Sequence, residues 1–285
     1  MTLTPIVDAH MHLWDPRAHY YPWLCDPQPI AFRYGDYSAL RRPYLPLDYR
    51  ADCAGWPVAG TVYVEAEWDP RDPHGEIDFV SRLRSQAGFP TVAIAQAWLD
   101  ADDCAGVLEA HAGRSFVRGV RHKPKPGQMD DARWRAGYAR LAPLGLHFEL
   151  QAPWRQLGEA ARLAADFPAT TVVLNHAGLP ENIPSGPWRE AMTALARCEN
   201  VAVKISGLGN LSHERRRDVI RALIELFGPR RAMFASNYPV DSLRMSFDAI
   251  FREFDEATRG LSDAQRRQLF HDNAITIYRM EQRHA

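Results

Sequence analysis

Cysteine is scarce in this sequence. Its four cysteines, Cys25, Cys53, Cys104 and Cys198, lie far apart and form no C-x-x-C pair. In a chain of 285 residues this spacing argues for reduced thiols and against a disulfide framework. No charged and apolar leader precedes the first motif, so we expect a protein of the cytoplasm.

Long apolar runs and a strong charge of either sign are also missing. No apolar stretch reaches the length of a membrane span, so we expect no membrane partner. The net charge is −1 with both signs spread along the chain, which excludes the basic surface of a nucleic-acid-binding protein. The expected partner is a small-molecule substrate. The sequence leaves open whether the chain forms a homo-oligomer.

The chain instead contains a regular alternation of short apolar runs and amphipathic segments. After a first strand that begins at Ile6, further strands are expected at Thr61–Ala66, Thr91–Ala97, Phe116–His122, Leu146–Leu150, Thr170–Leu174, Val201–Ile205 and Ala232–Ala235. Helices are expected at Glu76–Ala87, Asp100–Ala112, Asp130–Leu141, Trp154–Ala165, Trp188–Ala196, Ser212–Phe227, Ser246–Ala257 and Ser262–Tyr278, the last with a Ser-x-x-Gln capping box.

This alternation decides the fold class. The strands are apolar on both faces and, after the first, recur roughly every thirty residues, as in a parallel barrel covered by helices. A doubly wound sheet would carry a glycine-rich phosphate turn after an early strand, and none is present. We therefore predict an α/β protein with the (β/α)₈ TIM-barrel fold and a single domain over residues 1–285.

The stretch from Trp14 to about Ala54 interrupts the alternation. It is dense in tyrosine, tryptophan and proline and has no helical or strand period. A loop of this length inside a compact domain is uncommon unless it has a function. Two interpretations stay open: an irregular flap that covers the core, or a lid whose aromatic side chains form a pocket wall.

Two histidines, His10 and His12, stand one residue apart in the opening run IVDAHMHLWD. Residues two apart in a strand share a face, so both imidazoles should project to the same side. Burying two neighbouring imidazolium cations is costly, so we expect neutral rings that act as ligands or hydrogen-bond partners.

Polar residues follow nearly every predicted strand at its carboxyl end. Besides the two histidines these are Glu65, Glu67, Trp98, Arg121, His122, His176, Lys204, Asn237 and Asp241. The active site of a barrel lies at this end, so we expect these side chains to surround one cavity. Singly, each also has a structural interpretation: His176 as an interior histidine, Lys204 as an ammonium that snorkels to solvent, and Glu65 as the ion-pair partner of Arg121.

The segments VDAHMHLWD, VRGVRHKP, VVLNHAGLP, VKISGLG, MFASNYPVD and HDNAITIYRM resemble the amidohydrolase superfamily in this order. More narrowly, they resemble its amidohydrolase-2 branch of sugar-lactone and dicarboxylate-lactone hydrolases, over almost the whole chain. The resemblance implies a (β/α)₈ barrel and hydrolysis of a small acidic or polyhydroxylated substrate. It places His10 and His12 in the H-x-H motif, His176 at the strand-six histidine, and Arg121 at the arginine that faces a substrate carboxylate. Some relatives bind one divalent metal, others bind none, and some are decarboxylases.

Two positions depart from the family pattern. Gln151 stands where metal-dependent relatives have a strand-five histidine, and Asn237 stands where relatives have the aspartate that serves as base and metal ligand. An amide neither accepts a proton near neutral pH nor binds metal well. Asp241 is the first candidate for a relocated base, with a cap of the helix near Ser246 as the alternative, and Glu65 and Glu67 come next.

Three functions are compatible with these residues. The first is a lactonase. Its substrate would be held by Arg121, His122 and Lys204, assisted by Glu65, Glu67 and Trp98. The oxyanion would be supported by His10, His12 and His176, and the catalytic set would be completed by Asn237 and Asp241. The second is a metal-dependent amidohydrolase or decarboxylase with an ion on His10, His12 and His176. The third is a non-catalytic binder that lost its base at Asn237. We accordingly expect either no cofactor or one weakly bound, zinc-like divalent metal.

Overall fold

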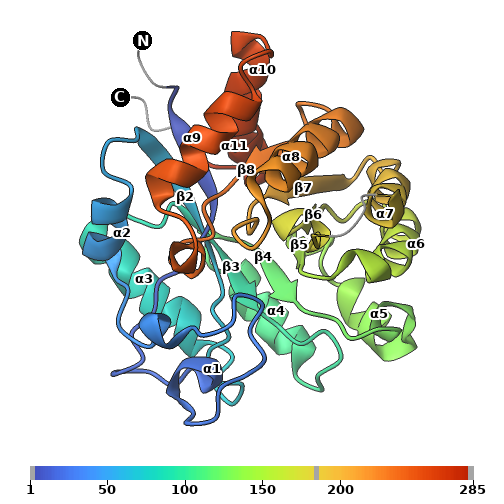
Figure 1. Cartoon of the computed structure of the whole chain (residues 1–285). Helices are drawn as coiled ribbons and strands as arrows, with labels where there is room; N and C mark the ends of the chain where they lie inside the picture. Colours follow the sequence, from blue (N-terminus) through green and yellow to red (C-terminus); the bar gives the residue numbers. More distant parts are fainter. Residues whose placement is uncertain (1–3, 183–185, 282–285) are drawn as a thin grey trace.

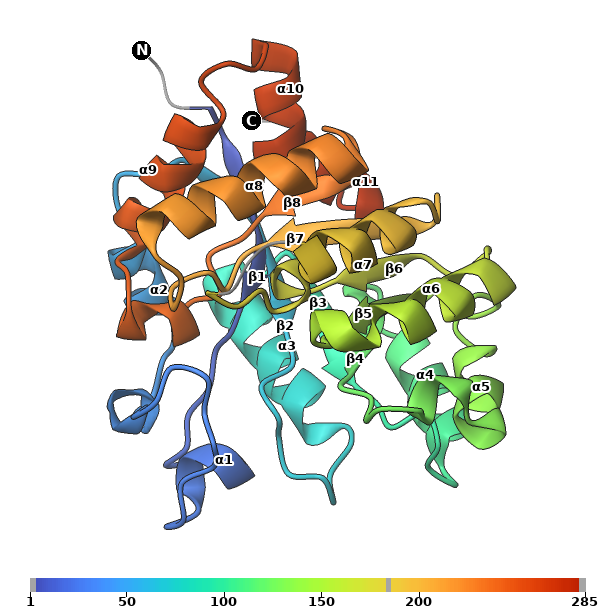
Figure 2. The same ribbon diagram turned by 45° about the vertical axis from the view of Figure 1, so that its right-hand side comes forward.

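The strands form one parallel sheet that curves into a barrel. The computed structural model describes residues 4–182 and 186–281, and within them eight strands pair side by side in sequence order. The strands are β1 (Ile6–Met11), β2 (Val58–Val64), β3 (Val92–Gln96), β4 (Val117–His122), β5 (His147–Leu150), β6 (Val172–Leu174), β7 (Val201–Ile205) and β8 (Ala232–Phe234). Figures 1 and 2 show them at the centre of the molecule with helices around them. The predicted (β/α)₈ fold with its alternating helices is confirmed.

The barrel is closed between its first and last strands by a short contact. Met11 and Tyr238 form an isolated parallel bridge. The backbone N–H of Asn237 donates to the carbonyl of His10 at 2.8 Å, and that of His12 donates to the carbonyl of Tyr238 at 2.7 Å. These bonds set the two histidines of β1 beside the segment that follows β8.

A buried carboxylate reinforces this closure. Asp8 accepts hydrogen bonds from the backbone N–H of Ser236 at 2.8 Å and from its hydroxyl at 2.6 Å. The hydroxyl of Tyr49 donates to the same carboxylate at 2.9 Å. Burial raises the pKa of Asp8, and these hydrogen bonds oppose that shift by favouring the carboxylate.

The interior of the barrel is packed with side chains. Small aliphatic residues of the strands, among them Val7, Val62 and Ile94, form a buried cluster with Tyr278 and Met280 from the C-terminal segment. Because these side chains fill the interior, we expect a ligand site at the rim of the barrel.

Helices connect and cover the strands. They are α1 (Pro22–Cys25), α2 (Pro46–Asp52), α3 (Gly75–Ala87), α4 (Cys104–Ala112), α5 (Ala132–Tyr138), α6 (Leu157–Asp166), α7 (Gly186–Ala196), α8 (His213–Phe227), α9 (Phe247–Ala257), α10 (Asp263–Arg267) and α11 (Asn273–Ile277). In the described residues, none of them combines the length and the apolar character needed to cross a membrane.

The last predicted helix, Ser262–Tyr278, is present as one helical segment with a π-helical turn in the middle. The capping box is present, because the hydroxyl of Ser262 accepts from the N–H of Gln265. A π-helical turn at Gln268–Asp272 then separates α10 from α11. Beyond it, the amide of Asn273 donates to the carbonyl of Ala232 at 2.7 Å, which ties α11 to the start of β8.

The long segment after β1 is more regular than predicted. It contains the short helices α1 and α2 and a 3₁₀ turn at Ser38–Leu40. Both α1 and α2 begin at proline, where the missing N–H costs nothing and the fixed φ favours a helix. In Figure 1 the part that includes α1 extends beyond the barrel at the bottom of the view, and α2 lies on its left.

Candidate active site

A cavity of about 370 Å³ opens at the carboxyl ends of the strands. One wall consists of residues at or after strand ends, namely His12, Glu67, Arg121, Lys123, Gln151, His176 and Asn237. The facing wall consists of residues of the long segment after β1, namely Trp14, Trp23, Ile30, Phe32 and Arg33. Imidazoles from β1 and from the end of β6 therefore meet the guanidinium of β4 around one opening.

The long segment thus combines both interpretations given above. Five of its tyrosines are buried against the barrel and serve as core, namely Tyr21, Tyr34, Tyr37, Tyr44 and Tyr49. Its tryptophan and phenylalanine rings meanwhile face the cavity. The indole N–H of Trp23 donates to the carbonyl of Ala66 at 2.8 Å, which fixes this wall to the end of β2.

His10 and His12 form a hydrogen-bonded pair on one face of β1. The Nδ1–H of His12 donates to the carbonyl of Val64 at 2.7 Å, so its Nε2 carries a lone pair. Nδ1 of His10 faces the Lys204 ammonium at 3.5 Å and accepts from it, so its Nε2–H points to His12 Nε2, 3.2 Å away. Burial, with a smaller effect of Arg121, lowers the pKa of His12 to about 3. Burial and then Lys204 lower the pKa of His10, so both rings are neutral near pH 7.

The structure corrects two of the predicted positions around this pair. His10 is fully buried behind His12 and does not line the cavity. Lys204 neither lines the cavity nor snorkels, because its fully buried ammonium binds the carboxylate of Glu149 at 2.8 Å. Burial, opposed by Glu149, lowers the pKa of Lys204 to about 8. The predicted contact between Lys204 and substrate is therefore wrong, because the ammonium contacts His10 instead.

His176 occupies a tight turn after β6. Its φ angle is 51°, in the left-handed region that side chains seldom adopt. Its Nδ1 lies 2.9 Å from the hydroxyl of Ser206. A Cβ at Gly207, whose φ is 66°, would lie 2.8 Å from that same nitrogen, so the close approach requires glycine. Burial, and then the charge of Arg33, lowers the pKa of His176 well below its usual value.

Arg121 is held rigidly at the end of β4. Its Nε donates to the carboxylate of Glu65, its Nη2 to the carbonyl of Glu65 at 2.5 Å, and its Nη1 to Gln151 at 3.0 Å. Both side chains of the predicted ion pair are buried. A guanidinium has five N–H groups, so one on each terminal nitrogen stays available for a ligand. Glu65 is fully engaged and is no longer a candidate base.

Asn237 and Asp241 do not occupy equivalent places. The amide N–H of Asn237 donates to the Asp241 carboxylate at 2.6 Å, which turns the amide oxygen of Asn237 away from this contact. The hydroxyl of Tyr34 donates to the same carboxylate oxygen at 2.6 Å. Asp241 lies behind Asn237 and off the cavity wall, and burial raises its pKa. It does not cap the next helix either, because Ser246 accepts from the N–H of Ala249 there.

A second hollow of about 480 Å³ adjoins the cavity. It shares with the cavity the lining residues Trp23, Ile30, Glu67, Arg121 and Lys123. The predicted substrate residues His122 and Trp98 line this second hollow and not the first. The predicted site is therefore one depression with two compartments.

Sequence reasoning missed two cations of the cavity. Arg33 reaches across from the long segment, where its Nη2 donates to the carbonyl of Gly207 at 2.9 Å. That segment has no helical or strand periodicity from which the direction of this side chain could be predicted. Lys123 pairs with Glu67, and its place directly after Arg121 and His122 was a usable signal. Glu67 is the acidic residue that the described part of the chain brings to the cavity wall.

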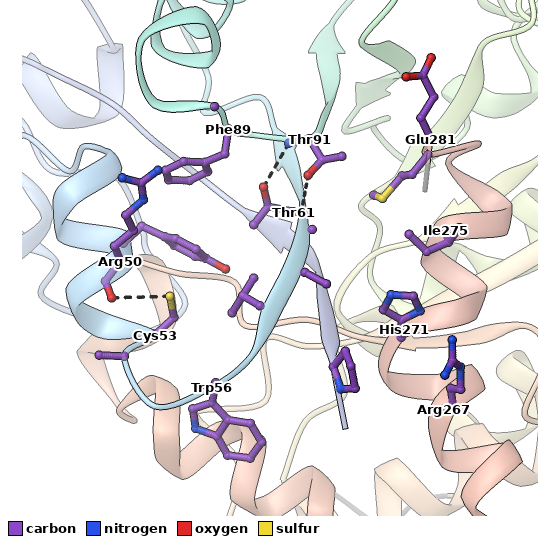
Figure 3. A pocket seen from close by; sticks show the side chains of 18 residues that line it. Arg50, Cys53, Trp56, Thr61, Phe89, Thr91, Arg267, His271, Ile275 and Glu281 are labelled. Carbon is purple, nitrogen blue, oxygen red and sulfur yellow. Dashed lines mark hydrogen bonds between the residues drawn. The ribbon is translucent and has the colours of Figure 1, made fainter. Parts of the chain in front are cut away.

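The largest hollow, about 720 Å³, lies at the opposite end of the barrel. Figure 3 shows it among Thr61, Thr91, Arg50, Trp56 and His271, near the amino ends of β2 and β3. The described residues of this amino-end hollow include none of the predicted site residues. Size alone therefore does not locate the candidate site.

Comparison with known proteins identifies the family of the chain. Residues 7–280 match the Amidohydrolase family of the Amidohydro_2 type, so the chain belongs to that family. It is 39% identical, over 96% of its length and 98% of the relative, to an uncharacterized protein, y4mH, of Sinorhizobium fredii. It is 26% identical to an L-fucono-1,5-lactonase of Burkholderia multivorans, with 95% of each chain covered. The family and this relative place the chain among hydrolytic enzymes.

Solved structures support the same fold. An amidohydrolase of Burkholderia multivorans with bound zinc aligns with a TM-score of 0.83 and 25% identity, over 97% of this chain and 100% of the other. The zinc in that structure raises the question whether the residues of this chain fit a divalent metal.

The donor set of this chain does not fit such an ion. A metal-bound histidine gives its other ring N–H to an acceptor, whereas His10 turns that nitrogen toward the Lys204 ammonium. The lone pair of His12 is engaged by the N–H of His10, and Asn237 replaces a charged ligand. Among residues 4–182 and 186–281, no group of three or more histidine, cysteine, aspartate or glutamate side chains is placed to hold a metal. The predicted ion on His10, His12 and His176 is therefore not supported by the geometry.

Proposed function

We propose that this chain is a lactonase that opens the ring of a small polyhydroxylated or acidic lactone with water. The observation that carries the proposal is the cavity wall, where aromatic rings face guanidinium and imidazole groups across one opening. Its volume of about 370 Å³ falls in the usual range for small-molecule pockets, roughly 300–1,000 Å³. The L-fucono-1,5-lactonase relatives support the same reaction class.

The two walls divide the work of binding. The indoles of Trp14 and Trp23 and the ring of Phe32 offer flat apolar surfaces to one face of a ring. Arg33, Arg121 and Lys123 would bind ring hydroxyls or a carboxylate, since guanidinium groups pair well with both. The excess of cations also matches the product, because opening any lactone creates a carboxylate.

Glu67 is our candidate for the general base. Asp241 and Glu65 are buried, whereas the side chain of Glu67, although paired with Lys123, is 43% exposed and lines the cavity. In the proposed step Glu67 takes a proton from water as the oxygen bonds to the lactone carbonyl carbon. The bond from that carbon to the ring oxygen then breaks, and Glu67 returns the proton to the departing oxygen. Free N–H groups of Arg121 stabilise the negative charge that develops on the carbonyl oxygen.

Two neutral groups assist this chemistry by position. The amide oxygen of Asn237 accepts a hydrogen bond from the attacking water or from a ring hydroxyl, because its N–H is committed to Asp241. His176 and His12 remain neutral near pH 7 and so place polar rings on the wall without adding repelling charge. None of these steps requires a metal.

The test is a panel of sugar-acid and aromatic-acid lactones, assayed by proton release with and without a chelator. We expect hydrolysis that a chelator leaves unchanged. The Glu67→Gln variant should lower kcat by about 10²–10⁴-fold with little change in KM, since it removes the base but keeps the shape. Glu281→Gln, in the amino-end hollow, is the matched control and should keep full activity. Activity lost in chelator would contradict the proposed step, and binding without turnover of any lactone would favour the non-catalytic binder.

A further inference from the structure

The second hollow is larger than the cavity that would hold the lactone ring. It measures about 480 Å³ against about 370 Å³, and the five shared lining residues make the two continuous. A small lactone is fully accommodated by the first cavity. The second hollow is therefore free to take another part of the same ligand.

One wall of the second hollow presents a fixed hydrogen-bond donor. Nδ1 of His122 accepts from the backbone N–H of Leu99 at 3.3 Å and from the indole N–H of Trp134 at 3.1 Å. Two donors on one nitrogen require a lone pair there, so the proton of the neutral ring is on Nε2. Burial lowers the pKa of His122, which keeps the ring neutral. Its Nε2–H is thus a donor without charge in a residue that lines the hollow.

Neighbouring side chains add unpaired neutral groups. Gln96 and Trp98 line the same hollow and are partly exposed. Within the part of the chain that the structure describes, no hydrogen bond engages the amide of Gln96 or the indole N–H of Trp98. Gln96 can both donate and accept, and Trp98 offers a flat face as well as one donor.

Most charged side chains of the hollow already bind a neighbouring side chain. Glu65 binds Arg121 and Glu67 binds Lys123. Asp26 accepts from the hydroxyl of Tyr20 at 2.8 Å, and Asp100 accepts from the amide of Gln128 at 2.7 Å. Apart from the exposed ammonium of Lys125, the groups left over are neutral donors and acceptors next to an aromatic face. This set favours a neutral, hydroxyl-rich ring over an anion or a hydrocarbon.

We infer that the second hollow is a subsite for a glycosyl group, so that the preferred substrate is a disaccharide lactone with its lactone ring in the first cavity. This inference rests on the proposed lactonase function and names its substrate class. Trp98 stacks on the apolar face of the second sugar, while Gln96 and the Nε2–H of His122 bind its hydroxyls. The shared residues Arg121 and Lys123 lie where the two rings join.

The experiment compares kcat/KM for glucono-1,5-lactone with kcat/KM for cellobiono-1,5-lactone and melibiono-1,5-lactone, which carry a second sugar on different oxygens. We expect at least one disaccharide lactone to exceed the monosaccharide lactone by tenfold or more. Trp98→Ala should remove that advantage while changing the rate on the monosaccharide lactone less than twofold. Trp154→Ala, a half-buried tryptophan outside both hollows, should leave the preference intact.

Two results would overturn the subsite, namely equal rates on all three lactones or an equal loss on both substrate types in Trp98→Ala. A Gln96→Ala variant guards against misfolding of the tryptophan variant, since the amide is not a core group. If no lactone is turned over, the proposed function fails, and calorimetry with gluconate, cellobionate and melibionate tests the subsite alone. Tighter binding of a disaccharide acid that Trp98→Ala abolishes would then support it, and equal binding of all three acids would refute it.

Discussion

The two ends of the barrel differ in how their polar groups are used. At the amino end the largest hollow is surrounded by groups that bind one another: Arg50 donates to the carbonyl of Ala87, and His271 contacts Asp272. At the carboxyl end Arg33, Arg121 and Asn237 line one cavity, and each keeps a hydrogen-bonding atom that no other described residue engages. The smaller cavity is the better candidate site because polar groups from several strand ends converge on it beside aromatic rings.

Backbone strain shows the same contrast. Non-glycine residues with φ above zero gather after the strands at the carboxyl end, namely Glu67 (60°), His176 (51°), Ala177 (56°), Leu179 (52°) and Asn237 (57°). At the amino end the structure gives one, Arg279 at 49°. Left-handed angles cost free energy and persist where the fold holds them for a purpose. Four of these residues, Glu67, His176, Leu179 and Asn237, line the proposed lactone cavity.

The largest expected difference between the two ends comes from removing one arginine from each. Arg121→Met leaves the buried carboxylate of Glu65 without its cationic partner, so we expect the free energy of unfolding to fall by about 3–5 kcal/mol. Loss of its free N–H groups should lower kcat/KM by about 10²–10³-fold. Arg267→Met, which removes an exposed ion pair with Asp272, should cost about 0–1 kcal/mol and no activity. Urea denaturation and steady-state kinetics measure both, and similar losses in the two variants would refute the contrast.

A matched pair of glycines gives the next largest effect. In Gly207→Ala the new Cβ collides with the ring of His176 and the guanidinium of Arg33, so we expect a tenfold or greater loss of kcat/KM. In Gly88→Ala, at the amino-end hollow, the new Cβ meets no heavy atom within 4 Å in the described structure. Its φ of 75° still makes the change destabilising. We expect a lower Tm in both variants but reduced activity only in Gly207→Ala.

A smaller effect is expected from a tyrosine hydroxyl. Tyr34→Phe removes one donor to Asp241, which then holds Asn237 less firmly, and one acceptor of Arg33, so kcat should fall about three- to tenfold with a smaller rise in KM. Tyr44→Phe removes a similar bond to Asp52 in the same segment, away from the cavity, and should leave kcat unchanged. A change confined to KM in Tyr34→Phe would contradict this positioning role.

The pH dependence of stability should be shared by both ends. Burial lowers the pKa of His12 to about 3 and of His147 to about 4, against about 6.5 when the chain is unfolded. Between these values the unfolded chain binds more protons, so stability rises with pH and falls as pH drops below about 6.5. Each such histidine contributes a slope of up to about 1.4 kcal/mol per pH unit. His147→Gln should reduce the slope of unfolding free energy without changing activity, whereas His12→Gln should change both.

The sequence was sufficient for the fold and for the inner wall of the cavity. Apolar runs about thirty residues apart predict the barrel because each strand must be buried on both faces. The polar residue that follows a run is then placed at the rim, which located His12, Arg121, His176 and Asn237. The resemblance to amidohydrolases pointed to the same positions.

The sequence could not predict how deeply each side chain is buried or which residue it contacts. Lys204 and Arg121 both lie at strand ends. The ammonium of Lys204 nevertheless turns inward to Glu149, whereas the side chain of Arg121 lines the cavity. Asp241 was a candidate base until its bonds to Tyr34 and Asn237 were visible. Such outcomes depend on residues far apart in sequence. Arg33 was missed for the same reason, since its segment has no period that assigns its side chain to a wall.

The anchoring of the segment after β1 also sets the route that molecules take. Trp23 ties it to the end of β2, and Tyr34 ties it to Asp241 beyond β8. Along the adjoining hollow, by contrast, Ile30, Gln28 and Lys125 are exposed to solvent. Substrate and product would thus both pass through this exposed side beside β3 and β4, so the product must leave before the next substrate enters.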